Sequence, residues 1–132
     1  MEKVYSIVMP GGSKVETTVR GFKISTDQPI KAGGENSAPS PFELFLASIG
    51  TCAGYYVAAF CQARGIPTAD IGLTQTMLKN ESTHLVEKIQ LELSLPPDFP
   101  EKYRDAVVKA AEACTVKKHL ASPPAISVSI KA

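Results

Sequence analysis

Apolar and polar positions alternate along the first part of the chain, and this pattern predicts short antiparallel strands. Residues 4–9, 15–19 and 22–24 each place apolar side chains at every second position, which is the side-chain period of a strand. Gly11–Gly12 separates the first two segments, and Gly21 breaks the pattern before the third. Glycines at such positions favour turns. The chain is therefore expected to begin with a β-meander of two or three strands.

A long loop and a long helix are expected next. Residues 26–41 are rich in Pro, Gly, Asn and Ser, and ordered loops of this length are often functional. Ser40 is a suitable N-cap and Pro41 suits the first helical position, while Gly65 and Pro67 end the helix. One face of this helix carries a regular apolar stripe formed by Phe45, Ile49, Cys52, Tyr56, Phe60 and Ala63.

The rest of the chain predicts a hairpin, a second helix and a last strand. Strands at 71–77 and 89–95 are joined by a connection at 80–83. A helix from about residue 100 carries an inward stripe, and alternation at 126–130 predicts a short strand. The stripe consists of Tyr103, Val107, Ala110 and Cys114, and the last strand carries Ile126, Val128 and Ile130. The order β-β-β-α-β-β-α-β is typical of an α+β fold, here a single domain of residues 1–132.

The long helix has more apolar surface than one chain can cover. Leu44–Cys61 contains no charged residue, which satisfies the length criterion for a membrane span. Its Ser, Thr and Gly residues and the lack of flanking basic clusters favour the core helix of a globular protein instead. One small sheet and one further helix leave Leu46, Tyr55, Val57 and Ala58 without neighbours. We therefore predict a homodimer with the long helices at its centre.

Composition limits the classes of function. The 132 residues carry 14 basic and 13 acidic side chains, a formal net charge of +1, which argues against nucleic-acid binding. No signal peptide is visible at the N-terminus. Three cysteines are an odd number that does not form a secreted disulfide framework. We expect a cytoplasmic protein, not bound to a membrane, whose thiols begin reduced.

The cysteines are the candidate chemical groups. Cys52 and Cys61 are nine positions apart on the predicted helix and face opposite sides, so they do not share a metal. Cys114 and His119 alone make a poor zinc motif, and no metal site is expected. Cys52 and Cys114 lie on the apolar stripes of two helices and could meet in the core, or both could be buried filler. We assign Cys61 to packing.

Two segments carry a family resemblance. Residues 33–44 read GGENSAPSPFEL and are followed by ASIGTC at 47–52; residues 110–118 read AAEACTVKK. Together they resemble the two cysteine motifs of the osmotically inducible protein C (OsmC) family, whose superfamily contains the organic hydroperoxide resistance (Ohr) proteins. The resemblance covers nearly the whole chain. It implies an intertwined homodimer in which antiparallel sheets wrap two central helices and active sites lie at the subunit interface.

The resemblance also implies a reaction. Cys52 matches the peroxidatic cysteine, which reduces an organic hydroperoxide to an alcohol and becomes a sulfenic acid. Cys114 matches the resolving cysteine, which forms a disulfide with it, and an external dithiol restores the pair. No metal, flavin or haem takes part.

Supporting residues are less closely matched. Peroxidatic members hold an arginine near the thiolate with a glutamate, and Arg20 and Glu43 are the candidates here. Phe42 stands where those members carry the glutamate, so the sequence is closer to an OsmC-like branch than to true Ohr proteins. Alkyl hydroperoxides would suit an apolar pocket, for which we select the aromatic residues Phe42, Phe45, Tyr55 and Tyr56.

Two other functions stay open at the level of the sequence. One is a dimer without enzymatic activity that binds an apolar or thiol ligand at the interface, with the cysteines as a redox sensor or carrier. The other is a protein whose thiols are inert core residues.

Overall fold

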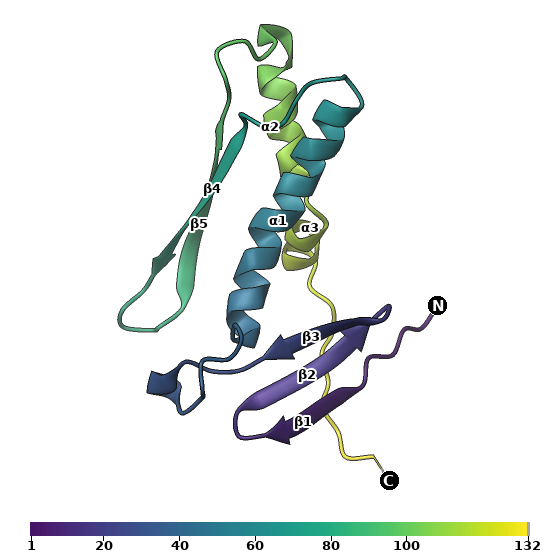
Figure 1. Cartoon of the computed structure of the whole chain (residues 1–132), viewed down its shortest axis with the longest axis vertical. Coiled ribbons are helices and arrows are strands. Elements are labelled where there is room, and N and C mark those ends of the chain that lie inside the picture. The colour runs from purple at the N-terminus through teal and green to yellow at the C-terminus, as the bar shows by residue number, and fades with distance from the viewer. Residues whose placement is uncertain (132) are drawn as a thin grey trace. The chain divides into compact units, whose positions relative to one another are not determined.

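The N-terminal part of the chain forms a three-stranded antiparallel sheet (Figure 1). The computed structural model describes residues 1–131, which divide into two compact units on either side of the Ala47–Ser48 bond. Strands β1 (Ile7–Gly11), β2 (Lys14–Val19) and β3 (Phe22–Thr26) lie in that order in the first unit. The predicted meander is confirmed, with strand bounds shifted by a few residues at β1 and β3.

The long loop after β3 is organised by a buried carboxylate. Asp27 is 1% exposed and its oxygens accept hydrogen bonds from the Gln28 N–H at 2.8 Å and from the Ser37 N–H and hydroxyl at 3.0 and 2.6 Å. The Glu35 N–H donates to it as well, at 3.3 Å. These donors, above all the Ser37 hydroxyl, lower the pKa of Asp27 to about 2. The hydrogen bonds to Asp27 therefore offset part of the conformational entropy that this loop loses when it becomes ordered.

Helix α1 (Pro41–Gln62) begins with a reciprocal cap. The Ser40 N–H donates to Glu43 Oε1 at 2.9 Å, and the Glu43 N–H donates to Ser40 Oγ at 3.2 Å. This is a capping box, which satisfies two backbone donors at the helix start. Gly65 adopts φ of 66° just beyond the helix end, a conformation suited to glycine. The predicted start and stop signals are confirmed.

One face of α1 is buried and the rest is not. Ile49, Ala53, Val57 and Cys61 are buried, and they follow one another at intervals of four. By length and composition, α1 is the one helix among residues 1–131 that could cross a membrane: an 18-residue window has mean hydropathy 1.6, and 22% of it is buried. The expected surplus of apolar surface is present at Tyr55, which is 64% exposed. The expectation that Val57 lacks a neighbour is wrong, because Val57 is 4% exposed and packs in the core.

Strands β4 (Gly72–Lys79) and β5 (Val86–Ser94) form the predicted hairpin in the second unit. Their register pairs Leu73 with Leu93 and Met77 with Ile89. Asn80 shapes the connection, because its side-chain oxygen accepts the N–H groups of residues 82 and 83 at 2.9 and 3.0 Å. Leu91, Leu93 and the other half-buried side chains of β5 alternate with exposed polar ones, as predicted for a sheet with one wet face.

The second predicted helix is broken where it was expected to continue. A 3₁₀ turn at Glu101–Tyr103 leads into α2 (Arg104–Glu112), and α3 (Thr115–Ala121) follows. Cys114 lies between them with extended backbone, φ −51° and ψ 124°. Cys114 does face inward, but the prediction that it is helical is wrong. The core of this unit joins α1 to α2 through Val57, Cys61, Phe99 and Val107.

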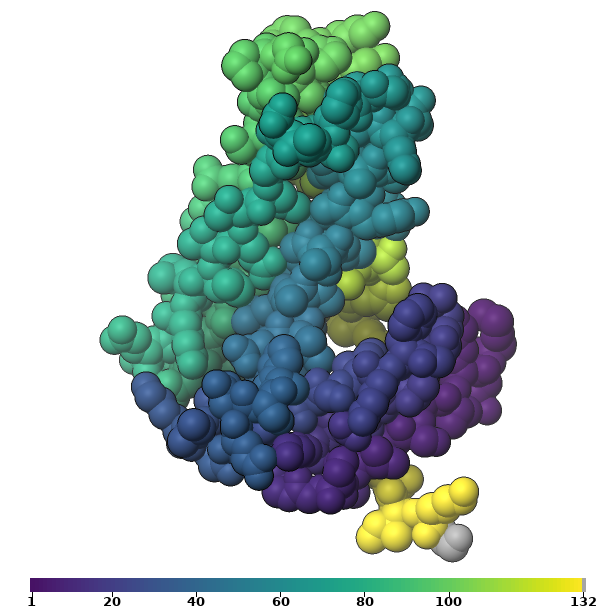
Figure 2. All heavy atoms as spheres, in the orientation of Figure 1, coloured from purple at the N-terminus to yellow at the C-terminus, as the bar shows by residue number. Residues whose placement is uncertain are grey.

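The last predicted strand does not form within this chain. Residues 123–131 have no regular secondary structure, and Ile126, Val128 and Ile130 are 86–97% exposed. Figure 2 shows this segment, in yellow, extending away from α3. A strand forms only where a neighbouring strand pairs with it through backbone hydrogen bonds, and no described residue pairs with this segment in that way. The architecture is otherwise the predicted α+β fold.

Candidate active site

Cys52 and Cys114 meet, although they come from different elements. Cys52 lies in the middle of α1 and is half-buried; Cys114 lies at the α2–α3 junction and is 2% exposed. The Cys114 thiol hydrogen-bonds to the Cys52 sulfur, and all three cysteines of the chain are free thiols. Helical periodicity left two possibilities for Cys52 and Cys114, which were contact in the core or separate burial as filler. The structure favours contact.

Backbone donors stabilise the ionised form of Cys52. The Val116 N–H donates to the Cys52 sulfur, and weaker donors are the Cys114 thiol and the Thr115 N–H. Together they lower the pKa of Cys52 against the opposing effect of partial burial. These N–H groups belong to the first two residues of α3, where the helix leaves its donors without internal partners. These donors were not predicted, because residues 115–121 were not expected to form a separate helix.

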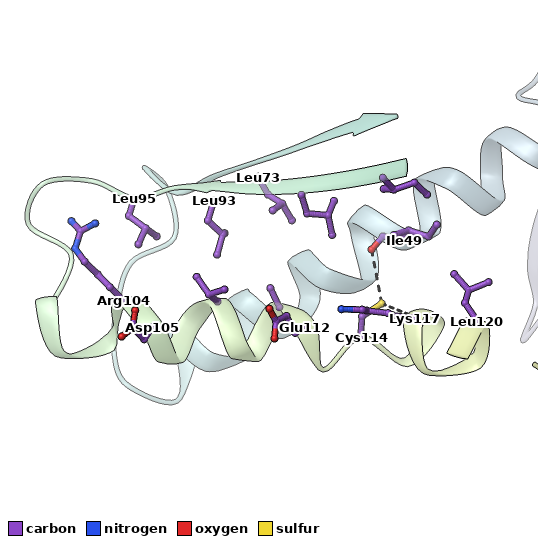
Figure 3. A pocket seen from close by; sticks show the side chains of 14 residues that line it. Ile49, Leu73, Leu93, Leu95, Arg104, Asp105, Glu112, Cys114, Lys117 and Leu120 are labelled. Atoms are coloured by element: carbon purple, nitrogen blue, oxygen red, sulfur yellow. Dashed lines mark hydrogen bonds between the residues drawn. The ribbon is translucent and has the colours of Figure 1, made fainter. Parts of the chain in front are cut away.

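Cys114 caps the same helix. Its sulfur accepts the Lys117 N–H at 3.4 Å and lies 4.0 Å from the Ile49 carbonyl oxygen (Figure 3). The single thiol proton of Cys114 therefore has two acceptors, the Ile49 carbonyl and the Cys52 sulfur. An ionised Cys52 is the stronger acceptor because hydrogen bonds to charged groups are stronger than neutral ones. These contacts suit a thiolate at Cys52.

Cys61 has the opposite environment. It is fully buried among Val57, Phe99 and Val107, and burial raises the pKa of its thiol, with a small opposing effect from Arg64. A neutral, inaccessible thiol is a poor nucleophile. The structure agrees with the assignment of Cys61 to packing.

An apolar cavity of about 560 Å³ reaches Cys114 from one side. It lies between the hairpin and the α2–α3 segment (Figure 3). Cys114 and Lys117 lie at one end, while Arg104 lies at the other, with its Nε 2.8 Å from Glu101 Oε2. The apolar lining consists of Ile49, Leu73, Ile89, Leu91, Leu93, Leu95, Val108, Ala111 and Leu120.

The aromatic residues selected for a substrate pocket lie elsewhere. Phe42 and Phe45 belong to the first unit, where their rings stack at 5.8 Å. Tyr55 is 64% exposed, and the Tyr56 hydroxyl lies 2.8 Å from Thr115 Oγ. None of the four lines the cavity described above. Aromatic side chains were predicted to line the substrate pocket, whereas this cavity is lined by aliphatic side chains of the hairpin and the helices.

Arg20 and Glu43 have local partners in the first unit. The Arg20 guanidinium lies 5.3 Å from the centre of the Phe22 ring, in the turn between β2 and β3. Glu43 uses Oε1 in the capping box of α1.

No metal site is present in the part of the chain that the structure describes. No group of three or more His, Cys, Asp or Glu residues is arranged to hold an ion there. His119 Nδ1 instead lies 2.8 Å from the Thr115 carbonyl oxygen, within its own helix.

A known protein family matches most of this chain, including Cys52 and Cys114. The family model of OsmC-like proteins matches residues 34–129, which include α1, both redox-active candidates and the hairpin between them. The chain belongs to the OsmC-like family. No curated protein sequence matches the chain significantly.

Solved structures share the fold at low sequence identity. A protein from Psychrobacter arcticus 273-4 has 18% identity and a TM-score of 0.73, over 89% of this chain and 88% of that one. An OsmC-like protein from Mycoplasma pneumoniae has 15% identity and a TM-score of 0.66, over 93% and 91%. An organic hydroperoxide resistance protein from Legionella pneumophila has 22% identity and a TM-score of 0.55, over 91% and 89%. These similarities establish the fold.

Proposed function

We propose that the protein is a thiol-dependent peroxidase that reduces organic hydroperoxides. The observation that supports this most is the contact between Cys52 and Cys114, with backbone N–H groups on the Cys52 sulfur that lower its pKa. A peroxidatic cysteine must be ionised near neutral pH and needs a second thiol close by. The similar Legionella structure is described as an organic hydroperoxide resistance protein, which is consistent with this reaction class.

In the proposed cycle, the Cys52 thiolate attacks the terminal oxygen of the hydroperoxide. An S–O bond forms, the O–O bond breaks, and the alkoxide takes up a proton to leave as an alcohol. Cys52 is then a sulfenic acid. The sulfur of Cys114 attacks the Cys52 sulfur, a disulfide forms and water leaves. An external dithiol reduces the disulfide by exchange and is itself oxidised.

The supporting residues follow the family resemblance. Arg20 is proposed as the cation that assists the thiolate, and Glu43 as the carboxylate that holds it. Glu43 Oε1 is used by the helix cap, and a carboxylate can accept a further bond at its other oxygen. Phe42, Phe45, Tyr55 and Tyr56 are proposed to favour apolar hydroperoxides. The cavity that reaches Cys114 offers aliphatic surface for the same purpose.

The active form is proposed to be a cytoplasmic homodimer. Tyr55 on α1, Val108 on α2 and Leu120 on α3 are apolar side chains that are 64%, 45% and 51% exposed in the single chain. A second copy would cover these faces. The cytoplasm supplies the dithiols that regeneration needs.

The alternative is a binding protein without turnover. The cavity of about 560 Å³ has the size of a small-molecule site, and Cys114 at its end could hold a thiol ligand. In that case the cysteine pair would act as a redox sensor or carrier.

Turnover separates the two functions. Purified protein is mixed with cumene hydroperoxide and excess dithiothreitol, and loss of hydroperoxide is followed with time. The peroxidase predicts many equivalents consumed per subunit, no turnover in Cys52→Ser, and near-normal turnover in Cys61→Ser as the matched control. Consumption no faster than that of dithiothreitol alone would contradict the peroxidase and favour the binding protein.

A further inference from the structure

Tyr56 connects α1 to the short helix that holds the Cys52 sulfur. Its hydroxyl oxygen lies 2.8 Å from Thr115 Oγ. Tyr56 follows Cys52 by one helical turn, so both side chains leave α1 on the same face. Thr115 is the first residue of α3, and its N–H and that of Val116 donate to Cys52. The Tyr56–Thr115 bond therefore links α1, which carries Cys52, to the residues whose N–H groups donate to the Cys52 sulfur.

Helix α3 has no buried residue of its own. It is only seven residues long and is followed by a segment without regular structure. Cys114 and Val116 are its more buried anchors, while Thr115 and residues 117–121 are exposed. The hydrogen bond between His119 and the Thr115 carbonyl lies within α3 and does not tie it to α1. The Tyr56 hydroxyl bonds to Thr115, the first residue of α3, and can therefore hold the start of this helix in place.

We propose that Tyr56 is a positioning residue for Cys52: its hydrogen bond with Thr115 holds the N–H groups of residues 115 and 116 against the sulfur. The inference rests on the proposed function, in which Cys52 reacts as a thiolate. Loss of the Tyr56 hydroxyl lets the start of α3 move, lengthens the N–H to sulfur contacts and destabilises the thiolate. Tyr56 acts through Thr115 and does not touch the reacting oxygen.

The titratable neighbours of Cys52 are few. Within residues 48–131, Cys114 is the ionisable side chain that contacts the Cys52 sulfur. The charged side chains of the packed elements, Glu112 on α2 and Lys117 and Lys118 on α3, are exposed. A change in the Cys52 titration after removal of the Tyr56 hydroxyl therefore reports on the backbone donors.

The test measures the rate of Cys52 alkylation by iodoacetamide against pH, resolved by peptide mass spectrometry in the full-length chain. Tyr56→Phe and Thr115→Val are expected to move the midpoint to higher pH and to slow labelling at pH 7 by roughly three- to tenfold, the range for one hydrogen bond. Thr115→Ser keeps the hydroxyl and should keep the wild-type profile. The double variant should shift no further than either single one, because both remove the same bond.

Tyr103→Phe is the matched control. Tyr103 lies in the 3₁₀ turn before α2 and packs edge-on against Phe60, with ring centres 5.7 Å apart, so loss of its hydroxyl should leave the Cys52 titration unchanged. Cys61 in the same peptide map reports folding, since it stays unlabelled while it is buried. If Tyr56→Phe does not fold, Thr115→Val carries the test.

An unchanged midpoint in folded Tyr56→Phe or Thr115→Val, or an equal shift in Tyr103→Phe, would overturn the positioning role. The readout uses no hydroperoxide. Failure of wild-type protein to react with cumene hydroperoxide would therefore count against the peroxidase while the alkylation profiles still decide the role of Tyr56.

Discussion

The Cys114 thiol hydrogen-bonds to the Cys52 sulfur and brings the α2–α3 junction onto the middle of α1. This contact joins two thiols with different surroundings. Cys52 faces backbone donors, whereas Cys114 caps a helix and borders an apolar cavity. In the proposed function, Cys52 is the thiol that ionises and attacks the hydroperoxide, and Cys114 is the thiol that resolves the sulfenic acid.

The pH dependence of thiol reactivity should separate Cys52 from Cys61. Since the thiolate is the nucleophile, labelling by iodoacetamide accelerates as pH rises through the pKa. The pKa of Cys52 is lowered by the Val116 N–H and its neighbours, and that of Cys61 is raised by burial. We expect the Cys52 midpoint below the ordinary cysteine value of about 8.5, and the Cys61 midpoint above it.

Peptide-resolved mass spectrometry measures both midpoints in one sample. In the unfolded chain, in guanidinium chloride, the two midpoints should converge because both environments are lost. Equal midpoints in the folded protein would contradict the assigned environments.

Asp27 should stabilise the fold in a pH-dependent way. Its pKa is about 2 in the folded chain, below the ordinary 3.8. The stabilisation is therefore fully present above about pH 4 and is lost as pH falls through about 2. Asp27→Asn should lower the denaturation midpoint at pH 7 and flatten its dependence between pH 5 and 2, because an amide keeps no charge to lose.

Urea unfolding across this pH range checks the prediction. Asp98→Asn is the control, since Asp98 is exposed. Asp27→Asn with the wild-type midpoint at pH 7 would show that the loop does not depend on the carboxylate.

The start of α1 allows capping to be separated from catalysis. Ser40→Ala removes the acceptor for the Glu43 N–H and should cost about 1 kcal/mol of stability, with little effect on the rate of Cys52 oxidation. Glu43→Gln keeps a capping oxygen but loses the charge that would hold Arg20. It should therefore retain stability and oxidise more slowly.

Stopped-flow oxidation by cumene hydroperoxide, paired with urea unfolding, measures both effects. Arg20→Ala should slow oxidation like Glu43→Gln. Wild-type oxidation rates in both variants would exclude the Arg20–Glu43 pair and leave the backbone donors as the main support of the thiolate.

The exposed C-terminal segment should contribute to association. Ile126, Val128 and Ile130 alternate and are almost fully exposed in the single chain. If they complete a sheet against a second copy, replacing all three by threonine should weaken the dimer by at least tenfold, because each buried apolar side chain contributes to association. Ser127→Thr with Ser129→Thr changes the intervening positions and serves as the control.

Sedimentation equilibrium at micromolar concentration measures the effect. A monomeric mass for the wild-type protein would contradict the homodimer. A dimer unaffected by the triple change would place the interface on the helices alone.

Local signals in the sequence predicted most of the fold. Turn glycines, the Ser40 N-cap and the alternation in β5 act over a few residues, so each is visible in the sequence. The break at Cys114 was missed because its residues continue a helical apolar spacing, and the extended backbone at Cys114 is favoured by contact with α1 rather than by local preference. The last strand was predicted from alternation, which cannot reveal whether a neighbouring strand is available.

The site could be predicted only in part. The two cysteines were found from helical spacing and family resemblance, but the donors on Cys52 are backbone groups that carry no residue-type signal. The cavity lining comes from two strands and three helices, and aliphatic residues of this kind look like ordinary core in the sequence.

The most direct measurement is the mass of the reduced protein after one equivalent of cumene hydroperoxide, followed by peptide mapping without reductant. The account predicts the loss of two hydrogens per chain and a disulfide that joins Cys52 to Cys114, with Cys61 still free. Cys114→Ser should instead gain oxygen on Cys52, and Cys52→Ser should not react. An unchanged mass after prolonged exposure, or a disulfide that includes Cys61, would contradict the account.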